Sequence, residues 1–190
     1  MMADWKVGYT GVTRLAWGYF FLYFDFNLGP VSILPDFVGY LLFLSGIGLL
    51  QEERRDLALL RPLGILLAIW HTVLWGGDWL GLSLAERLPI LYLIVSLASL
   101  YFHFQLLTDC AALAQRYQGP GDGLDQRLLW WRTVQTLLLT AADALTVLPQ
   151  STPRDTAVIV MAVVIIIACV CLMRALFALR RVFLPQSEEE

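Results

Sequence analysis

The chain has 190 residues, of which 58% are apolar and 15% are charged, and its mean hydropathy is +0.67. This composition excludes an ordinary soluble domain, which needs a larger polar surface, and it predicts an integral membrane protein. The net charge is −3 and no basic face carries interleaved aromatic residues, so nucleic-acid binding is not expected.

Apolar segments separated by clusters of polar residues predict an all-α, polytopic membrane helix bundle with about six transmembrane helices. Residues 1–185 are expected to form this single domain, and residues 186–190 a disordered acidic tail. The predicted spans are residues 9–28, 37–50, 62–79, 88–107, 128–148 and 157–179. The second span measures only about 21 Å against a hydrocarbon core of about 30 Å, so the first two segments either cross or form a hairpin that does not fully cross.

Basic residues are distributed unevenly between the two ends of these spans. The residues expected on the side of the termini are Lys6, Arg14, Arg54, Arg55, Arg61, Arg116, Arg127, Arg132, Arg174, Arg180 and Arg181. Only Arg87 and Arg154 fall on the opposite side. Because basic residues near span ends are retained in the cytoplasm, both termini are predicted to be cytoplasmic and the protein a multi-pass protein of the cell membrane.

The first connection, predicted to face outward, contains several polar residues between two apolar runs. Asp36 follows Pro35 at the start of the second span, where we expect its carboxylate to act as an N-cap. Asp25 and Asn27 interrupt the end of the first span. A carboxylate such as Asp25 needs a partner, a proton or a water-filled cavity in an apolar segment.

Glycines of the second span predict close approach to another helix. Gly39, Gly46 and Gly48 lie in this span, and Gly39 and Gly46 are seven residues apart on one face. Small residues at such positions let two helix backbones approach closely in a membrane.

Polar residues of the next three spans form stripes, each on one helix face. The third span has His71, Trp75 and Asp78; the fourth has Tyr92, Ser96, Ser99 and His103; the fifth has Arg132, Gln135, Thr136, Thr140 and Asp143. Because lipid-facing polar groups are costly, we expect the three stripes to face one another. Depth along the helices places Asp25, Asp78 and Asp143 near the outer ends, His103 and Arg132 near the cytoplasmic side, and His71 near the middle.

No cofactor motif is present, and the sequence assigns no metal ligands. The sixth span has no polar stripe and is predicted to be peripheral. Its Cys169 and Cys171 point about 200° apart on a helix and so do not share a metal.

The segment Leu28 to Phe43, LGPVSILPDFVGYLLF, resembles a segment of small uncharacterised polytopic membrane proteins of Gram-positive bacteria. The resemblance covers under a tenth of the chain. It implies a bacterial cell membrane as the location and carries no established activity.

Three functions remain open from the sequence. The first is a structural or accessory helix bundle, in which the stripes form interhelical hydrogen bonds and another membrane protein is the partner. The second is a transporter or binding protein with an outward-facing polar cavity for protons, a cation or a small cationic solute. The third is an intramembrane aspartyl enzyme using Asp25 and Asp78, since the Gly-Gly-Asp run at Gly76 to Asp78 resembles that of intramembrane aspartyl proteases.

Overall fold

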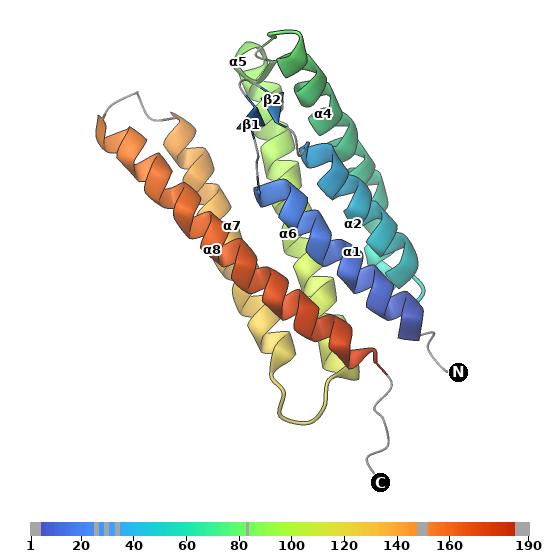
Figure 1. Ribbon diagram of the computed structural model, residues 1–190. Helices are drawn as coiled ribbons and strands as arrows, with labels where there is room; N and C mark the ends of the chain where they lie inside the picture. The colour runs from blue at the N-terminus through green and yellow to red at the C-terminus, as the bar shows by residue number, and fades with distance from the viewer. Residues whose placement is uncertain are drawn as a thin grey trace.

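A computed structural model describes residues 5–24, 27–28, 31–32, 35–82, 84–147 and 152–184. Long helices of alternating direction dominate this part of the chain, which confirms the all-α class (Figure 1). They are α1 (Trp5–Tyr23), α2 (Asp36–Leu50), α4 (Arg61–Trp79), α6 (Pro89–Tyr117), α7 (Leu124–Val147) and α8 (Thr152–Val182). Helix α1 begins and α8 ends at the same end of the bundle, which we name the terminus end.

Short elements lie in the connections. Helices α3 (Asp56–Leu59) and α5 (Leu84–Arg87) have four residues each. Strands β1 (Asn27–Leu28) and β2 (Val31–Ser32) pair in antiparallel orientation. The predicted first span, residues 9–28, is therefore wrong at its C-terminal end, because α1 stops at Tyr23 and residues 27–28 belong to β1.

Three helical segments are long and apolar enough to cross a membrane, fewer than the six predicted. They are Asp56–Trp79, Pro89–Tyr117 and Asp155–Val182. Helix α2 is apolar but has only 15 residues. Helices α1 and α7 have sufficient length but carry more polar side chains, which lowers their hydropathy.

Helices α6 and α7 extend beyond the predicted spans toward the terminus end. Helix α6 continues ten residues past Leu107, to Tyr117, and α7 begins at Leu124, four residues before the predicted start. Gln118 explains the early start, because its Oε1 accepts from the backbone N–H groups of Leu124 and Asp125, at 2.9 and 3.2 Å. Its Nε2 donates to the Asp125 carboxylate, at 2.8 Å, and this bond lowers the pKa of Asp125.

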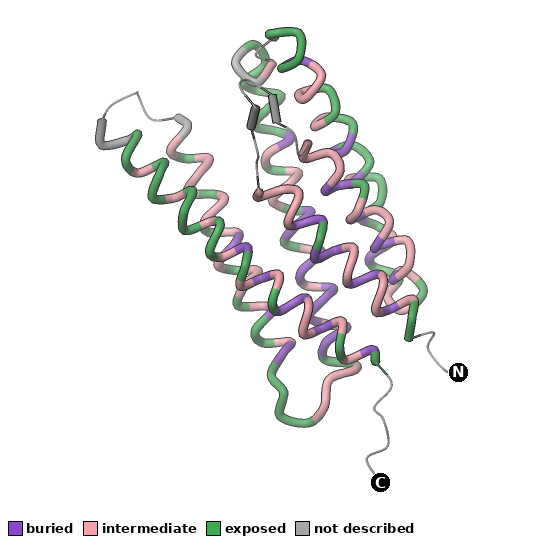
Figure 2. Tube along the Cα trace, viewed as in Figure 1, coloured by how far each residue is buried: buried purple, intermediate pink, exposed green. Residues whose placement is uncertain are grey.

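The helices pack in a ring in the order α1, α2, α4, α6, α7, α8 and back to α1. Large side chains from α1, α2 and α6 fill its interior, and Tyr19, Tyr40, Phe43 and Phe102 are at most 1% exposed. Figure 2 shows the buried residues on the inward faces and the exposed ones on the outside. The outside is strongly apolar, as on Ile90 of α6 and Ile159 of α8, which suits contact with lipid tails.

Helices α1 and α2 approach each other through glycines, as predicted for Gly39 and Gly46. A Cβ on Gly39 would lie 2.8 Å from the carbonyl oxygen of Gly18, and one on Gly46 would lie 2.9 Å from that of Gly11. The prediction is wrong for Gly48, where a Cβ would meet nothing within 4 Å. The backbones of α1 and α2 are therefore in direct contact, and this contact needs glycine at positions 39 and 46, where a larger side chain would clash.

Candidate functional site

Polar residues of α6 bond to three different helices. Ser96 Oγ donates to Asp143 Oδ2 on α7, at 2.5 Å. Ser99 Oγ lies 2.9 Å from the Tyr40 hydroxyl of α2, within hydrogen-bond distance. His103 Nδ1 lies 3.3 Å from the Tyr19 hydroxyl of α1. The stripe predicted on the fourth span is thus real, but its members reach around and across the ring.

His103 occupies the centre of the buried aromatic cluster. It is 2% exposed, and the ring centroids of Tyr40, Phe43 and Phe102 lie 5.4 to 6.1 Å from its own. Its Nε2 atom is buried and has no hydrogen-bond partner among the described residues. Aromatic faces surround this imidazole, so it is held as a core side chain and does not face a solvent-filled channel.

Polar residues of α7 are bonded to neighbouring helices or to the backbone of α7. Arg132 donates to Thr108 Oγ1 of α6, at 3.1 Å. Gln135 Nε2 donates to the Tyr23 hydroxyl of α1, at 2.7 Å. Thr136 and Thr140 each donate to the carbonyl of the residue four positions earlier, both at 2.8 Å. These two hydroxyl groups therefore satisfy their donors within the helix.

Asp36 is not the N-cap of α2, contrary to the prediction. Pro35 holds the cap position, without a side-chain hydrogen bond, and Asp36 is the first helical residue. The Asp36 carboxylate lies 3.2 Å from Nδ1 of His71 on α4, forming an ion pair when the imidazole is protonated. Helix α4 lies beside α2, which explains why the aspartate reaches this partner.

The expectation that the stripes of the third, fourth and fifth spans face one another is confirmed only for α6 and α7. His71 of α4 points toward α2, and Trp75 of α4 packs edge-on against Phe37, which is also on α2. In the ring, α6 separates α4 from α7. A polar stripe shows which face of a helix is buried, but it does not show which helix packs against that face. The order of the helices around the ring could therefore not be predicted from the stripes.

Of the three aspartates predicted near the outer ends, the structure describes Asp78 and Asp143, and it does not bring these two together. Asp78 is exposed near the end of α4, whereas Asp143 of α7 bonds to Ser96 of α6, and the backbones of α4 and α7 do not approach each other. Figure 1 shows α4 and α7 ending on different sides of the bundle. Asp25 and the side chain of Asn27 lie outside the described residues. Tyr92, the first residue of the stripe predicted on the fourth span, is also exposed, with 39% of its surface accessible.

Sequence reasoning missed a buried acidic centre at the terminus end. Asp109 of α6 is 0% exposed, and its carboxylate accepts from Arg54 Nε at 2.8 Å and from Gln105 Nε2 at 3.3 Å. Arg54 also contacts Asp56, at 2.9 Å. The predicted fourth span ended at Leu107, so Asp109 lay outside it and no role was predicted for this residue. Asp109 follows the apolar run by only two residues, and this closeness was the available signal that it belongs to the same helix.

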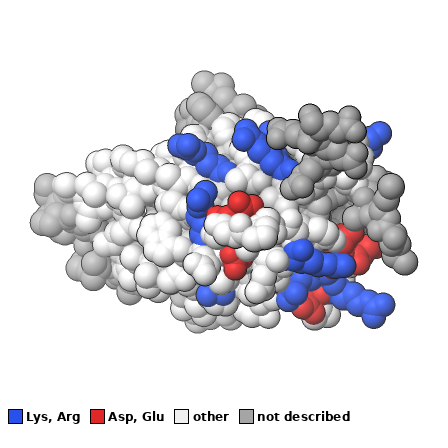
Figure 3. Space-filling view, turned by 90° about the horizontal axis from the view of Figure 1, so that it is seen from below, with Lys and Arg blue, Asp and Glu red and all other residues white. Residues whose placement is uncertain are grey.

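A second bond set joins the same connection to α6. The Tyr117 hydroxyl donates to the Glu53 carboxylate, and Arg116 donates to the Glu53 backbone carbonyl at 3.1 Å. The connection between α2 and α3 is therefore fastened along α6 by Arg54 and Glu53. Figure 3 shows this end of the molecule, with acidic side chains close to basic ones.

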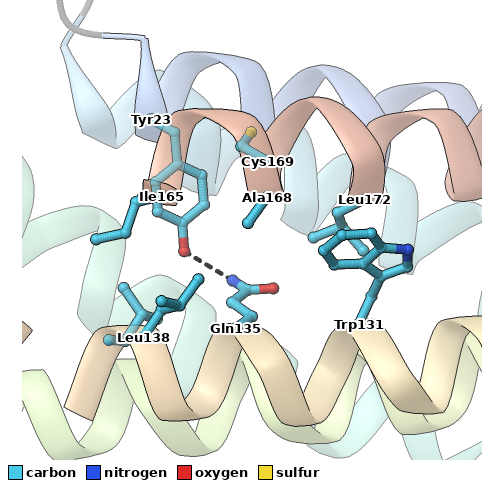
Figure 4. A pocket seen from close by; sticks show the side chains of 9 residues that line it. Tyr23, Trp131, Gln135, Leu138, Ile165, Ala168, Cys169 and Leu172 are labelled. Carbon is cyan, nitrogen blue, oxygen red and sulfur yellow. Dashed lines mark hydrogen bonds between the residues drawn. The ribbon is translucent and has the colours of Figure 1, made fainter. Parts of the chain in front are cut away.

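A narrow crevice lies between α1, α7 and α8 (Figure 4). It measures about 280 Å³ with its open side included. Its walls are mainly apolar, with Tyr23 and Gln135 as the bonded polar pair, and the Gln135 Oε1 atom is buried with no hydrogen-bond partner among the described residues. The described residues contain no cluster of side chains able to hold a metal ion.

Comparisons with known proteins give no further guide, since no family model, no curated protein and no solved structure matches the chain. The geometry of the polar residues therefore carries the functional argument.

Proposed function

We propose that the protein is a six-span helix bundle of the cell membrane with a structural or accessory role, and that both termini are cytoplasmic. Its polar residues hold the helices together, and its apolar outer faces meet lipid and another membrane protein. The observation that carries this proposal is the pairing of the polar stripes between helices.

One of the pairings connects consecutive helices, and two connect helices that are far apart in the sequence. Ser96 with Asp143 joins α6 to α7, Ser99 with Tyr40 joins α6 to α2, and Gln135 with Tyr23 joins α7 to α1. Such bonds contribute modestly one by one, on average about 0.6 kcal/mol in membranes, but together they connect neighbouring helices and helices on opposite sides of the ring. A helix bundle held in this way needs no ligand to account for its polar residues.

The orientation follows from charge and from the alternating helices. All but two of the basic residues fall toward the terminus end, which the positive-inside rule places in the cytoplasm. Helices α1 and α7 complete the six crossings only if the ring shields their polar side chains from lipid, and the bond between Gln135 and Tyr23 is consistent with this. Helix α2 is apolar but only about 22 Å long, so as a crossing it needs a locally thinner bilayer.

The transport hypothesis has less support, because a cation site would need carboxylates that share one cavity. Asp143 bonds to Ser96, and Asp78 is exposed at the end of α4, which α6 separates from α7 in the ring. The aspartyl-enzyme hypothesis needs Asp25 beside Asp78 and gains no support from the described residues.

Asp143→Asn distinguishes the structural role from transport. In proteoliposomes with an imposed proton or Na⁺ gradient, we expect the wild type and this variant to give the flux of protein-free vesicles. Asparagine still accepts from Ser96, so stability should change little, whereas Ser96→Ala should lower the free energy of unfolding by about 1 kcal/mol. Saturable uptake that Asp143→Asn abolishes without loss of stability would overturn the proposal.

A further inference from the structure

Four arginines line an open hollow at the terminus end. Arg127 comes from the start of α7, and Arg174, Arg180 and Arg181 come from the last part of α8. None of the four forms an ion pair with another described residue; Asp122 lines an adjoining hollow but stays beyond salt-bridge distance of them. Arg180 and Arg181 offset the dipole at the end of α8, but Arg127 and Arg174 lie outside that turn. Clustered like charges of this kind favour binding of an anion.

Arg180 is held in place by aromatic rings. Its guanidinium carbon lies 5.1 Å from the ring centroid of Tyr9 on α1 and 4.5 Å from that of Phe177 on α8. Its Nε atom is buried without a hydrogen-bond partner among the described residues. A guanidinium oriented in this way loses little side-chain entropy when it binds a phosphate.

An apolar groove runs from this hollow along the boundary of α1 and α8. Trp17, Phe20 and Phe24 form one wall, and Val170 and Met173 form the other. Arg174 and Phe177 line both the groove and the charged hollow, so the two are continuous. A phosphate and a hydrocarbon chain belonging to one molecule would therefore find adjacent sites.

We propose that this composite surface binds one anionic phospholipid. Its phosphate lies among Arg174, Arg180 and Arg181, with Arg127 at the rim, and one acyl chain lies in the groove between α1 and α8. Arg174 precedes the end of α8 by eight residues, about 12 Å along the helix, so its long side chain extends toward the level of the lipid headgroups. This inference goes beyond the structural role and needs only that α8 crosses the membrane.

Native mass spectrometry of the full chain in a neutral detergent tests the proposal. After delipidation, the protein is titrated with phosphatidylglycerol and with phosphatidylcholine of the same acyl chains. We expect one phosphatidylglycerol to bind at least tenfold more tightly. Arg174→Gln combined with Arg181→Gln should remove this preference, because both side chains are exposed and replacing them leaves the core intact.

Arg55→Gln is the matched control, since Arg55 is exposed and has no salt bridge or side-chain hydrogen bond to a described residue, and this variant should bind as the wild type does. Val170→Trp fills the groove and should weaken lipid binding without affecting the arginines. Equal binding of both lipids, or full competition by inorganic phosphate at the lipid's concentration, would overturn the assignment to a phospholipid. Tight binding that appears only after deletion of residues 187–190 would identify the chain's own acidic tail as the occupant and would also overturn it.

Discussion

Arg54→Ala is expected to lower the free energy of unfolding by about 3 kcal/mol, the lower end of the range for breaking a buried ion pair. The Asp109 carboxylate has no exposed surface, and Arg54 is its only cationic partner among the described residues. Without the guanidinium, the carboxylate keeps only the bond from Gln105 and must stay buried as a charge or take up a proton. The Arg54 side chain is 34% exposed, which favours the lower figure. Reversible unfolding in mixed micelles measures the effect.

Two further variants separate the ion pair from general effects of charge. Arg55→Ala removes an exposed neighbouring charge and should change stability by less than about 0.5 kcal/mol. Arg54→Met combined with Asp109→Leu should recover most of the stability, because neither charge remains to be buried. A loss as large for Arg55→Ala as for Arg54→Ala would refute the role given to Asp109.

Gly39→Ala should destabilise the protein by about 1–3 kcal/mol through overpacking. The added methyl group would lie 2.8 Å from the Gly18 carbonyl oxygen, and a backbone atom cannot rotate away as a side chain can. Helices α1 and α2 would have to separate, which would also disturb the Tyr19–Phe43 contact between them. Thermal unfolding in detergent, followed by circular dichroism, measures the loss.

Gly48→Ala is the control for this experiment. It lies on the same helix, and a Cβ there meets nothing within 4 Å. Because alanine favours the helix over glycine by about 0.5–1 kcal/mol, the variant should be as stable as the wild type or slightly more so. Equal destabilisation by both substitutions would contradict the close α1–α2 contact.

The sequence was sufficient to predict the long helices and many of the polar residues that form hydrogen bonds between them. Apolar runs between charged clusters located each long helix, and the seven-residue spacing located the contact at Gly39 and Gly46. The stripes also identified Ser96, Ser99, Gln135 and Asp143 as residues with inward hydrogen bonds. These features depend on periodicity along one helix, which a single sequence contains.

The partners of these residues depend on the order of helices around the ring, and periodicity does not contain that order. Asp36 was predicted to be the N-cap of its own helix because the sequence showed only its position at the start of that helix. Its partner His71 lies 35 residues away. Asp109 was missed for a related reason: hydropathy ends a span where charges begin, but Arg54 allows α6 to continue as a buried helix past that point. The Tyr19, Tyr23 and Tyr40 hydroxyls were likewise overlooked as partners, since their rings read as apolar core.

The most direct test of the structural role is the water accessibility of the polar stripe on α6. Ser96→Cys and Ser99→Cys are made singly in a background lacking Cys110, Cys169 and Cys171, and intact cells are treated with a membrane-impermeant, cationic thiosulfonate. An outward cavity with acidic walls would concentrate this reagent. Under the proposed orientation, Leu80→Cys, at the end of α4 opposite the terminus end, should react, and Gly119→Cys, between α6 and α7, should react only after permeabilisation.

The account predicts that neither Ser96→Cys nor Ser99→Cys reacts within the time that Leu80→Cys needs for completion, because both positions are occupied in bonds between helices. Modification of Ser96→Cys from outside at a rate comparable to that of Leu80→Cys would contradict it, and would show that the stripe lines a water-filled cavity.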